Sequence, residues 1–242
     1  MYALIFGANS DIAKATARQL ATQKINVYLA ARNIEQCTLF ANDLRIRYQI
    51  ETQAIAFDAL DFQSHETLYT SLKHSPEIVL IAYAELLQET DDNNDFNTRK
   101  KIIDINFSST INLLDIVSSA FAKRGSGTIV AISSVAGMRG RKTNYLYGAT
   151  KAALTTYLSG LRNRYYDKNL TIITVLPGFV DTKMTKDMTL PKLLTASPEQ
   201  VAASIIKAID KKKSIIYCKP IWRFIMWLIQ LIPESIFKRL SI

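Results

Sequence analysis

The sequence is poor in the residues that build glycine-rich, disulfide-rich and metal-binding proteins. Its 242 residues include 8 glycines, 2 cysteines and 2 histidines. Cys37 and Cys218 form neither a disulfide framework nor a metal-ligand spacing, and His65 and His74 belong to no cluster. We therefore expect no metal site and a reduced, cytoplasmic setting.

We also expect no secretory leader and no membrane-spanning segment. Residues 2–6 are apolar, with no basic residues before them and no cleavage site after them. Near the C-terminus, the apolar run of 12 residues at 221–232 contains Arg223 and Gln230, whereas a spanning helix needs about 20 apolar residues. We expect a protein that does not cross a membrane.

Acidic residues are fewer than basic ones. Thirty Lys and Arg against 21 Asp and Glu give a net charge of +9, which favours an anionic partner such as nucleic acid, a phospholipid surface or a phosphorylated substrate. The charge alone does not choose among these. The chain has no aromatic-and-basic RNA motif and no recognition helix with clustered arginines, so nucleic acid is the least favoured partner and we expect none.

Short apolar runs alternate with amphipathic helical patterns along the chain. The predicted strands are residues 2–6, 26–30, 51–57, 78–83, 128–132, 171–176 and 214–218. Helical patterns begin near Asp11, Ile34, Phe62, Arg99, Asn144 and Pro198, and residues 91–95 are polar enough to form a loop. This alternation predicts an α/β fold: a single-domain, Rossmann-type, doubly wound, parallel seven-stranded sheet with helices on both faces. Residues 1–218 would form the domain, and 219–242 a helical extension of it.

The turn after the first predicted strand is a candidate phosphate site. Gly7 permits a tight turn and close backbone approach, and the helix starting at Asp11 presents free amides to a pyrophosphate. An ordinary strand-to-helix turn is the alternative. After the second strand, an acidic residue would favour NAD and an arginine NADP; the chain has Arg32, which tilts the expectation toward NADP(H) unless it is only a surface residue. Asp58 is either an adenine contact or a cap.

Tyr147 and Lys151 are the strongest candidates for chemistry. Residues four apart share a helix face, so Lys151 can lie beside Tyr147 but not beside Tyr145. A phenol titrates near pH 10, and a neighbouring ammonium stabilises its anion. We expect Lys151 to lower the pKa of Tyr147. A surface helix with an aromatic residue and a solvated lysine is the alternative.

Further motifs agree with that pair. A strand runs into the Ser-rich loop that contains Ser134, Asn106 lies in the preceding helix, and "PGFVDT" occupies residues 177–182. Asn106, Ser134, Tyr147 and Lys151 together resemble the active-site set of the short-chain dehydrogenase/reductase family, and the resemblance extends over residues 2–218. It implies an NAD(P)-dependent ketone reductase that forms a homodimer or homotetramer.

The resemblance also implies a role for each residue. Ser134 would stabilise the developing alkoxide, Tyr147 would donate the proton, and Lys151 would lower the tyrosine pKa and hold the nicotinamide ribose. Asn106 would position a water, and Thr182 would contact the carboxamide. The implied cofactor-binding residues are Gly7, Asn9, Ser10, Asp11, Ile12, Arg32, Asp58, Ala82, Tyr147, Lys151, Pro177, Gly178, Val180 and Thr182.

Two departures from the family pattern affect the cofactor site. Asp11 and Ala13 stand where the turn usually has its second and third glycines, and a carboxylate beside a pyrophosphate is unfavourable unless it caps the helix or faces away. Residues 81–84 read "IAYA", where the family usually has "NNAG". Together with "FDALD", "YGATKAAL" and the final "SIFKRLSI", these two segments resemble the sequences of one branch of the family. The enzymes of that branch reduce decaprenylphosphoryl 2-keto-erythropentose.

That branch suggests a lipid-linked ketone with a phosphate. Arg139, Arg141 and Lys142 would attract the phosphate at the mouth of the site, or they form a solvated basic loop. The extension 219–242 carries two tryptophans and flanking lysines, as expected of a segment lying in the headgroup region at the inner face of the membrane. A helix buried at a subunit interface or over the substrate pocket is equally compatible. A non-catalytic dinucleotide sensor is the rival function.

Overall fold

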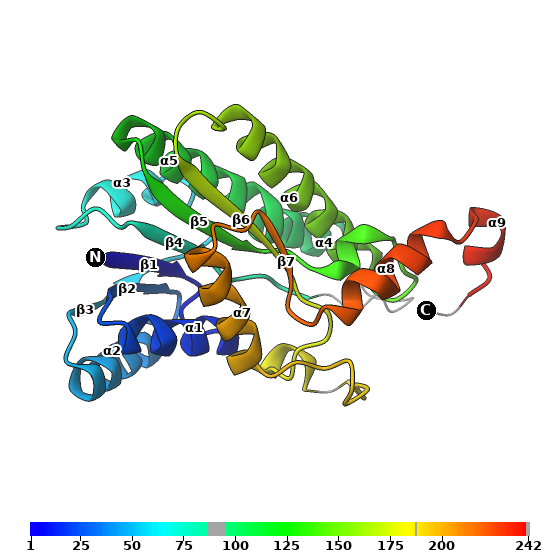
Figure 1. The fold of residues 1–242 in the computed structure, drawn as a ribbon, viewed down its shortest axis with the longest axis horizontal. Helices are drawn as coiled ribbons and strands as arrows, with labels where there is room; N and C mark the ends of the chain where they lie inside the picture. Colours follow the sequence, from blue (N-terminus) through cyan, green and yellow to red (C-terminus); the bar gives the residue numbers. More distant parts are fainter. Residues whose placement is uncertain (87–94, 187, 241–242) are drawn as a thin grey trace.

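The computed structural model describes residues 1–86, 95–186 and 188–240. Its centre is a seven-stranded parallel sheet with the order β3-β2-β1-β4-β5-β6-β7 (Figure 1). The strands are β1 Tyr2–Phe6, β2 Asn26–Ala31, β3 Thr52–Ala56, β4 Ile78–Ile81, β5 Gly127–Ile132, β6 Leu170–Leu176 and β7 Ile215–Tyr217. The chain reverses its direction of travel across the sheet between β1 and β4, which makes the carboxyl ends of these two strands the expected ligand-binding crevice.

Helices cover both faces of the sheet. They are α1 Asp11–Thr22, α2 Ile34–Tyr48, α3 Ser64–Thr70, α4 Phe96–Ile103, α5 Ser109–Arg124, α6 Tyr145–Arg164, α7 Pro198–Asp210, α8 Ile221–Leu231 and α9 Glu234–Phe237. A π-helical turn, Asp104–Ser108, joins α4 to α5, and short 3-10 turns lie at Val135–Met138 and Lys183–Thr185. Side chains from α1, α2 and α7 fill the core on one face, and those from α3, α5 and α6 fill the core on the other (Figure 1).

Strand β1 shows why the sheet is buried on both faces. Ala3 and Ile5 point into the core beneath α1, α2 and α7, while Leu4 and Phe6 point into the core beneath α5 and α6. Side chains of a strand alternate between faces, so four consecutive apolar residues serve two cores. Such continuous apolar runs are typical of parallel sheets covered on both sides.

The predicted fold class is confirmed. All seven predicted strands are present, with ends displaced by no more than two residues. The helix predicted near Phe62 begins at Ser64, and the one predicted near Arg99 begins at Phe96, because the Asp95 carboxylate accepts a hydrogen bond from the Thr98 amide and caps it. Of the predicted loop at 91–95, only Asp95 lies within the described residues.

The C-terminal helices form an arm that projects from the sheet (Figure 1). Trp222 and Met226 of α8 are buried against Val135 and Leu176, so the base of the arm packs on the ends of β5 and β6. The opposite side of α8 is exposed. Across the described part of the chain, none of the helices has both the length and the apolar character needed to span a bilayer.

Candidate active site

The turn between β1 and α1 brings the backbone close to the end of β4. Gly7 adopts φ +77°, and a Cβ at this position would lie 2.8 Å from the Ala82 carbonyl oxygen. Both the left-handed conformation and the close approach require glycine. Ser10 fixes the turn, because its hydroxyl donates to the Ala82 carbonyl oxygen over 2.9 Å and accepts from the Ala13 amide. One glycine therefore suffices for a turn that usually has three.

The Asp11 carboxylate, in the first turn of α1, is hydrogen-bonded to a segment outside that helix. Its Oδ2 accepts a hydrogen bond of 2.9 Å from the backbone amide of Lys183, in the loop after β6. The sequence required that a carboxylate near a pyrophosphate either cap the helix or face away. The Asp11 charge is instead stabilised by the amide of another segment. Asp11 therefore ties the loop after β6 to α1 and leaves the turn at Gly7 accessible.

A groove of about 360 Å³, which we call the Arg32 groove, crosses the ends of β1, β2 and β4. Arg32 extends into solvent, with its Nη1 3.8 Å from Glu85 Oε1. Asp58 Oδ1 accepts from the Leu60 amide, so it caps a turn while lining the groove. Asn9 Oδ1 is buried and has no hydrogen-bond partner among the described residues, whereas its Nδ2 donates to the Asn33 carbonyl oxygen.

A second cavity of about 570 Å³ adjoins that groove, and we call it the Tyr147 cavity. The two share Asn9, Ser10, Arg32, Ala82, Tyr83, Ala84 and Met184, so they form one continuous depression over the carboxyl ends of the strands. The predicted cofactor residues lining the groove are Gly7, Asn9, Ser10, Arg32, Asp58 and Ala82. Those lining the cavity are Asn9, Ser10, Asp11, Ile12, Arg32, Ala82, Tyr147, Lys151, Pro177, Gly178, Val180 and Thr182.

Ser134, Tyr147 and Lys151 meet in the Tyr147 cavity. Ser134 follows β5, and the other two occupy successive turns of α6. The Lys151 ammonium donates to the Ile132 carbonyl oxygen over 2.9 Å and lies 5.6 Å from the centroid of the Tyr147 ring. A hydrogen bond links Ser134 to the Tyr147 hydroxyl. The predicted proximity of these three residues is thus present.

The pKa of Tyr147 differs from the expectation. Burial raises the pKa of its phenol to about 12, and the hydrogen bond from Ser134 only partly opposes that rise. Burial also lowers the pKa of Lys151, to about 8. The expected net lowering of the tyrosine pKa is therefore wrong, because removing water from the phenol disfavours its anion more than the Ser134 hydrogen bond favours it. The phenol remains protonated at neutral pH.

Asn106 lies behind the cavity instead of lining it. Its Oδ1 accepts from the Glu85 amide over 2.7 Å, and its Nδ2 donates to the Glu85 carbonyl oxygen over 2.8 Å. The side chain thus pairs with the backbone that follows β4. Asn106 is fully buried within the π-helical turn Asp104–Ser108, a distortion often found at functional sites. Its predicted contact with a water stays a prediction.

The three basic residues predicted to meet a substrate phosphate have different environments. Arg139 is engaged by the arm: its Nη2 lies 2.8 Å from Glu234 Oε2, and its guanidinium stacks 4.1 Å from the centroid of the Phe237 ring. Lys142 is exposed, and neither it nor Arg139 lines the cavity. Of the three, only Arg141 lines the cavity. The expected phosphate contact is therefore corrected for the other two residues, because Arg139 pairs with the arm and Lys142 points into solvent.

The arm supplies a wall of the cavity that sequence spacing did not reveal. A Cβ at Gly178 would lie 2.0 Å from the indole of Trp222, so glycine is needed for the helix to dock. The Trp222 Nε1 donates to the Leu194 carbonyl oxygen over 3.0 Å. Two tryptophans in residues 219–242 indicated that this segment buries an apolar surface. The sequence could not show that Trp222 packs against Gly178, more than forty positions away.

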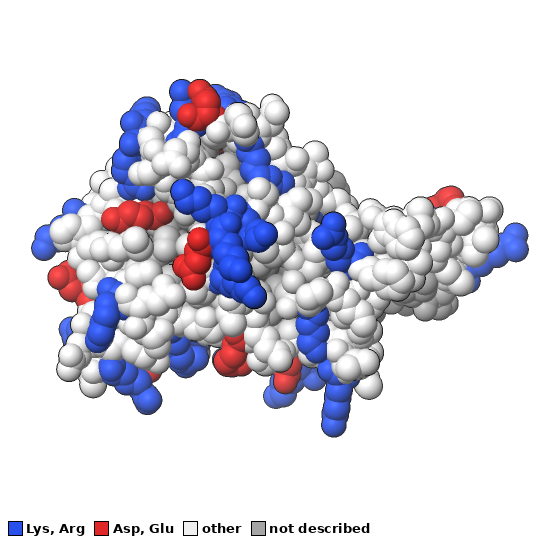
Figure 2. Space-filling model, viewed as in Figure 1, with Lys and Arg blue, Asp and Glu red and all other residues white. Residues whose placement is uncertain are grey.

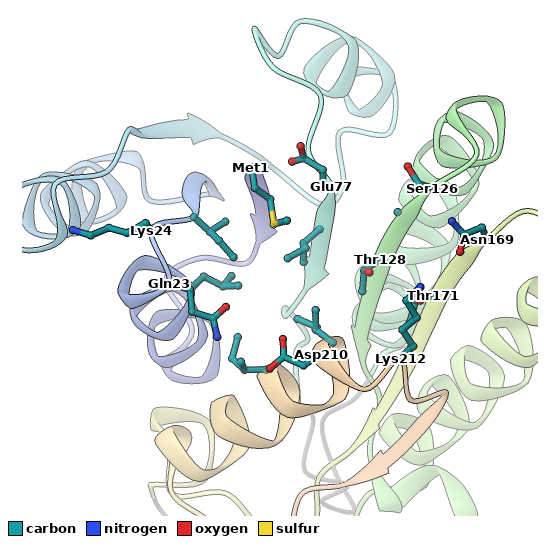
Figure 3. A pocket seen from close by; sticks show the side chains of 16 residues that line it. Met1, Gln23, Lys24, Glu77, Ser126, Thr128, Asn169, Thr171, Asp210 and Lys212 are labelled. Carbon is teal, nitrogen blue, oxygen red and sulfur yellow. The ribbon is translucent and has the colours of Figure 1, made fainter.

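A further hollow, of about 520 Å³, lies at the opposite edge of the sheet (Figure 3). Its wall includes the starts of β4, β5 and β6, and Glu77, Asp210, Lys24 and Lys212 surround it (Figure 3). Ligands of open α/β sheets bind outside the carboxyl ends of the strands, so this hollow at the amino ends is not the nucleotide site.

The chain belongs to the short chain dehydrogenase family, whose profile matches residues 1–192. It is an oxidoreductase of that family. An uncharacterized oxidoreductase of Mycobacterium tuberculosis strain H37Rv is 32% identical over 240 residues, covering 98% of this chain and 96% of that protein. The very-long-chain 3-oxoacyl-CoA reductase of Anas platyrhynchos is 28% identical, covering 97% of this chain and 76% of that protein.

A solved structure agrees with the architecture. The short-chain dehydrogenase from Sphingobium yanoikuyae in complex with NADPH superimposes with a TM-score of 0.84, covering 97% of each chain at 20% identity. At this identity the likeness concerns the fold alone.

Proposed function

We propose that this oxidoreductase reduces a ketone to a secondary alcohol with NADP(H), using Ser134, Tyr147 and Lys151. The observation that carries the proposal is the meeting of these three side chains in a cavity continuous with the Arg32 groove. A hydroxyl donor, a protonated phenol and an ammonium then lie in a continuous depression over the carboxyl ends of the strands, where dinucleotides bind in open α/β sheets.

Each side chain has a definite task in this reduction. The Ser134 hydroxyl donates a hydrogen bond to the carbonyl oxygen and stabilises the negative charge that develops there. The Tyr147 phenol, whose pKa is raised to about 12, holds its proton at neutral pH and passes it to the alkoxide oxygen. The Lys151 ammonium, within the same buried site, stabilises the phenolate that this transfer leaves.

The residues of the depression fit a dinucleotide. The bare turn at Gly7 admits a pyrophosphate, and the unpartnered Asn9 Oδ1 offers a buried acceptor for a ribose hydroxyl. Arg32 and the absence of a carboxylate directly after β2 favour the 2′-phosphate of NADP(H). When bound, the nicotinamide supplies the hydride.

Replacing Arg32 with alanine is expected to raise the KM for NADPH about tenfold and to change the KM for NADH less than about twofold, because only NADPH presents a phosphate to the guanidinium. Steady-state oxidation of both cofactors measures the effect. Arg45→Ala, which removes the same charge from an exposed site of α2, is the matched control. An equal change for the two cofactors would refute the NADP assignment.

We further propose a lipid-linked ketone as substrate, with a polyprenyl-phosphate ketosugar as the specific candidate. The Tyr147 cavity is lined by Phe179, Met184, Met188 and Trp222, which together offer an apolar wall. A relative of this chain is, by name, a reductase of very-long-chain 3-oxoacyl-CoA. The narrower candidate is supported by the resemblance of several sequence motifs to those of the ketosugar-reductase branch.

The reaction is tested by NADPH and NADH oxidation against a panel of ketones. The panel contains a polyprenyl-phosphate ketosugar, a long-chain 3-oxoacyl-CoA, and short ketones without a lipid. The highest kcat/KM is expected for the lipid-bearing compounds. Oxidation of neither cofactor with any ketone would contradict the proposed reaction, and turnover of the short ketones alone would contradict the lipid-linked substrate.

We also propose that the arm rests on an anionic membrane surface, as the inner leaflet provides. The outward side of α8 presents Phe224, Trp227 and Leu231, which are 59%, 54% and 60% exposed. Lys238 and Arg239 follow α9, and Figure 2 shows basic atoms at the outer end of the arm, which also bears an acidic group. An apolar face with adjacent cations is the pattern of interfacial helices, and the net charge of +9 complements anionic headgroups.

Substituting serine at Phe224, Trp227 and Leu231 together is expected to reduce flotation with anionic vesicles at least about tenfold, because each side chain loses apolar area buried in the interface. The comparison uses vesicles with and without anionic lipid. Leu39→Ser/Ile46→Ser changes apolar residues of α2 that are even more exposed, and this variant should float like the wild type. If the triple variant floated like the wild type but light scattering showed a change of oligomeric state, this face of α8 would instead contact a second copy of the chain.

A further inference from the structure

Two polar atoms without partners lie in the wall of the Tyr147 cavity. Arg141 Nε and Asn144 Oδ1 are both buried and lack a hydrogen-bond partner among the described residues. They belong to one turn, closed by a 3.3 Å hydrogen bond from the Asn144 amide to the Arg141 carbonyl oxygen, which leads directly into α6. Buried polar groups are normally paired, so two together beside the reactive residues call for a ligand.

The environment of Arg141 is apolar. Its guanidinium donates to the Met226 sulfur over 3.4 Å, a weak acceptor, and forms no ion pair with a described carboxylate. Burial lowers the pKa of Arg141, as expected where a cation loses water without gaining an anion. Arg139, two residues earlier, has both a carboxylate and an aromatic ring. Of the two arginines in this loop, Arg139 is paired with a carboxylate, whereas Arg141 has no described anion beside it.

The balance of charge around the cavity points the same way. The cations that line it are Arg32, Arg141, Lys151 and Lys183. Asp11 is the single carboxylate among its described lining residues, and that side chain is engaged by the Lys183 amide. Lys151 donates to the Ile132 carbonyl oxygen, which leaves Arg141 as the cation near α8 that is available to an incoming anion.

Arg141 is also placed on the substrate side of the depression. It lines the Tyr147 cavity but not the Arg32 groove, and its neighbour Met226 belongs to the arm. The pyrophosphate of a dinucleotide is expected at the turn between β1 and α1. An anion bound at Arg141 is therefore part of the substrate and not of the cofactor.

We infer that Arg141, assisted by Asn144, recognises an anionic group of the substrate, so that the enzyme selects ketones bearing a carboxylate or a phosphate. The guanidinium presents a planar pair of donors that suits either group, and the Asn144 oxygen accepts from a hydroxyl beside it. This inference rests on the proposed reduction and names the class of ketone that enters.

The test compares charged ketones with uncharged partners. Keto acids with different separations between ketone and carboxylate are paired with their methyl esters, and ketose phosphates are paired with the free ketoses. For the best pair, the wild type should prefer the anion by at least about 30-fold in kcat/KM, and Arg141→Leu should lose most of that preference. Carboxylate and phosphate pairs report separately, so the preferred anion is identified.

A second variant guards against misfolding of the first. Asn144→Asp retains Arg141 and its contact with Met226 but supplies an internal carboxylate, so it should also abolish the preference for anions. Arg141→Lys should retain part of it. Lys142→Gln, which removes a neighbouring exposed charge, should keep the wild-type ratio. An unchanged ratio in both Arg141→Leu and Asn144→Asp would overturn the inference.

Binding without turnover separates this inference from the proposed reaction. In a Trp227→Phe background, Trp222 is the sole tryptophan, and it lines the cavity. Titration with inorganic phosphate and with octanoate should change its fluorescence, with a Kd raised at least about tenfold by Arg141→Leu. If ketones were not reduced but this difference appeared, anion recognition would stand while the reaction fell. Identical binding curves would overturn anion recognition.

Discussion

Replacement of Tyr147 by phenylalanine is expected to lower kcat for ketone reduction by about a thousandfold and to leave NADPH affinity within about twofold. In the proposed reaction the phenol donates the proton to the alkoxide oxygen, and phenylalanine keeps the aromatic ring that packs in the cavity. Steady-state kinetics measures kcat, and quenching of tryptophan fluorescence measures cofactor affinity.

Tyr145→Phe is the matched control for that substitution. Tyr145 begins α6 two positions earlier, is 46% exposed, and its hydroxyl lies 3.4 Å from guanidinium nitrogens of Arg99. Removing this hydroxyl should change kcat less than about twofold. If Tyr147→Phe and wild type turned over equally, the proton donor would have to be another group. A wild type that binds NADPH but reduces no ketone would favour a dinucleotide sensor.

Replacement of Lys151 by methionine is expected to abolish reduction and, at the same time, to stabilise the fold. Burial lowers the pKa of this lysine from 10.5 to about 8, which corresponds to about 3 kcal/mol of unfavourable desolvation at neutral pH. Losing the hydrogen bond to the Ile132 carbonyl oxygen offsets about 1 kcal/mol of the gain. We expect a net increase of about 2 kcal/mol in the free energy of unfolding at pH 7.

The gain should vanish at high pH. Between about pH 8 and pH 10.5 the unfolded lysine binds a proton that the folded one has released, so the wild type becomes relatively more stable as the pH rises. Methionine cannot titrate, and the ionisation of Tyr147 is common to both proteins. Urea unfolding at pH 7 and about pH 10 measures the difference.

Leu154→Met, a conservative change at a buried site three positions further along α6, is the control, and its effect should not depend on pH. A Lys151→Met protein that is less stable than wild type at pH 7, or equally shifted at both pH values, would show that the ammonium is not desolvated as described.

The sequence was sufficient where function depends on local spacing. The four-residue interval from Tyr147 to Lys151 places both on one face of α6, and the apolar runs of β1 and β4 carry their own strand signal. Gly7 predicted a tight turn, and the turn has the left-handed conformation that only glycine adopts readily. Such features need no knowledge of distant residues.

The sequence was insufficient where the environment of a group decides its chemistry. The direction of the Tyr147 pKa shift follows from burial of the phenol in the folded protein. Whether Arg139 or Arg141 faces the cavity depends on Glu234 and Phe237, almost a hundred residues later. Asp11 places a negative charge near the expected pyrophosphate, and only the structure shows that the Lys183 amide binds this carboxylate. No local pattern contains these pairings.

The contact between Gly178 and Trp222 joins the stretch that the family profile covers to the stretch that follows it. Gly178 belongs to the stretch that the family profile covers, while Trp222 and Met226 lie beyond residue 192. In the proposed reaction, the residues of proton transfer lie within the profile, whereas Trp222 beyond it supplies a wall of the Tyr147 cavity. Exchanging endings between relatives, with a glycine retained opposite the tryptophan, offers a direct way to redirect which ketones are accepted.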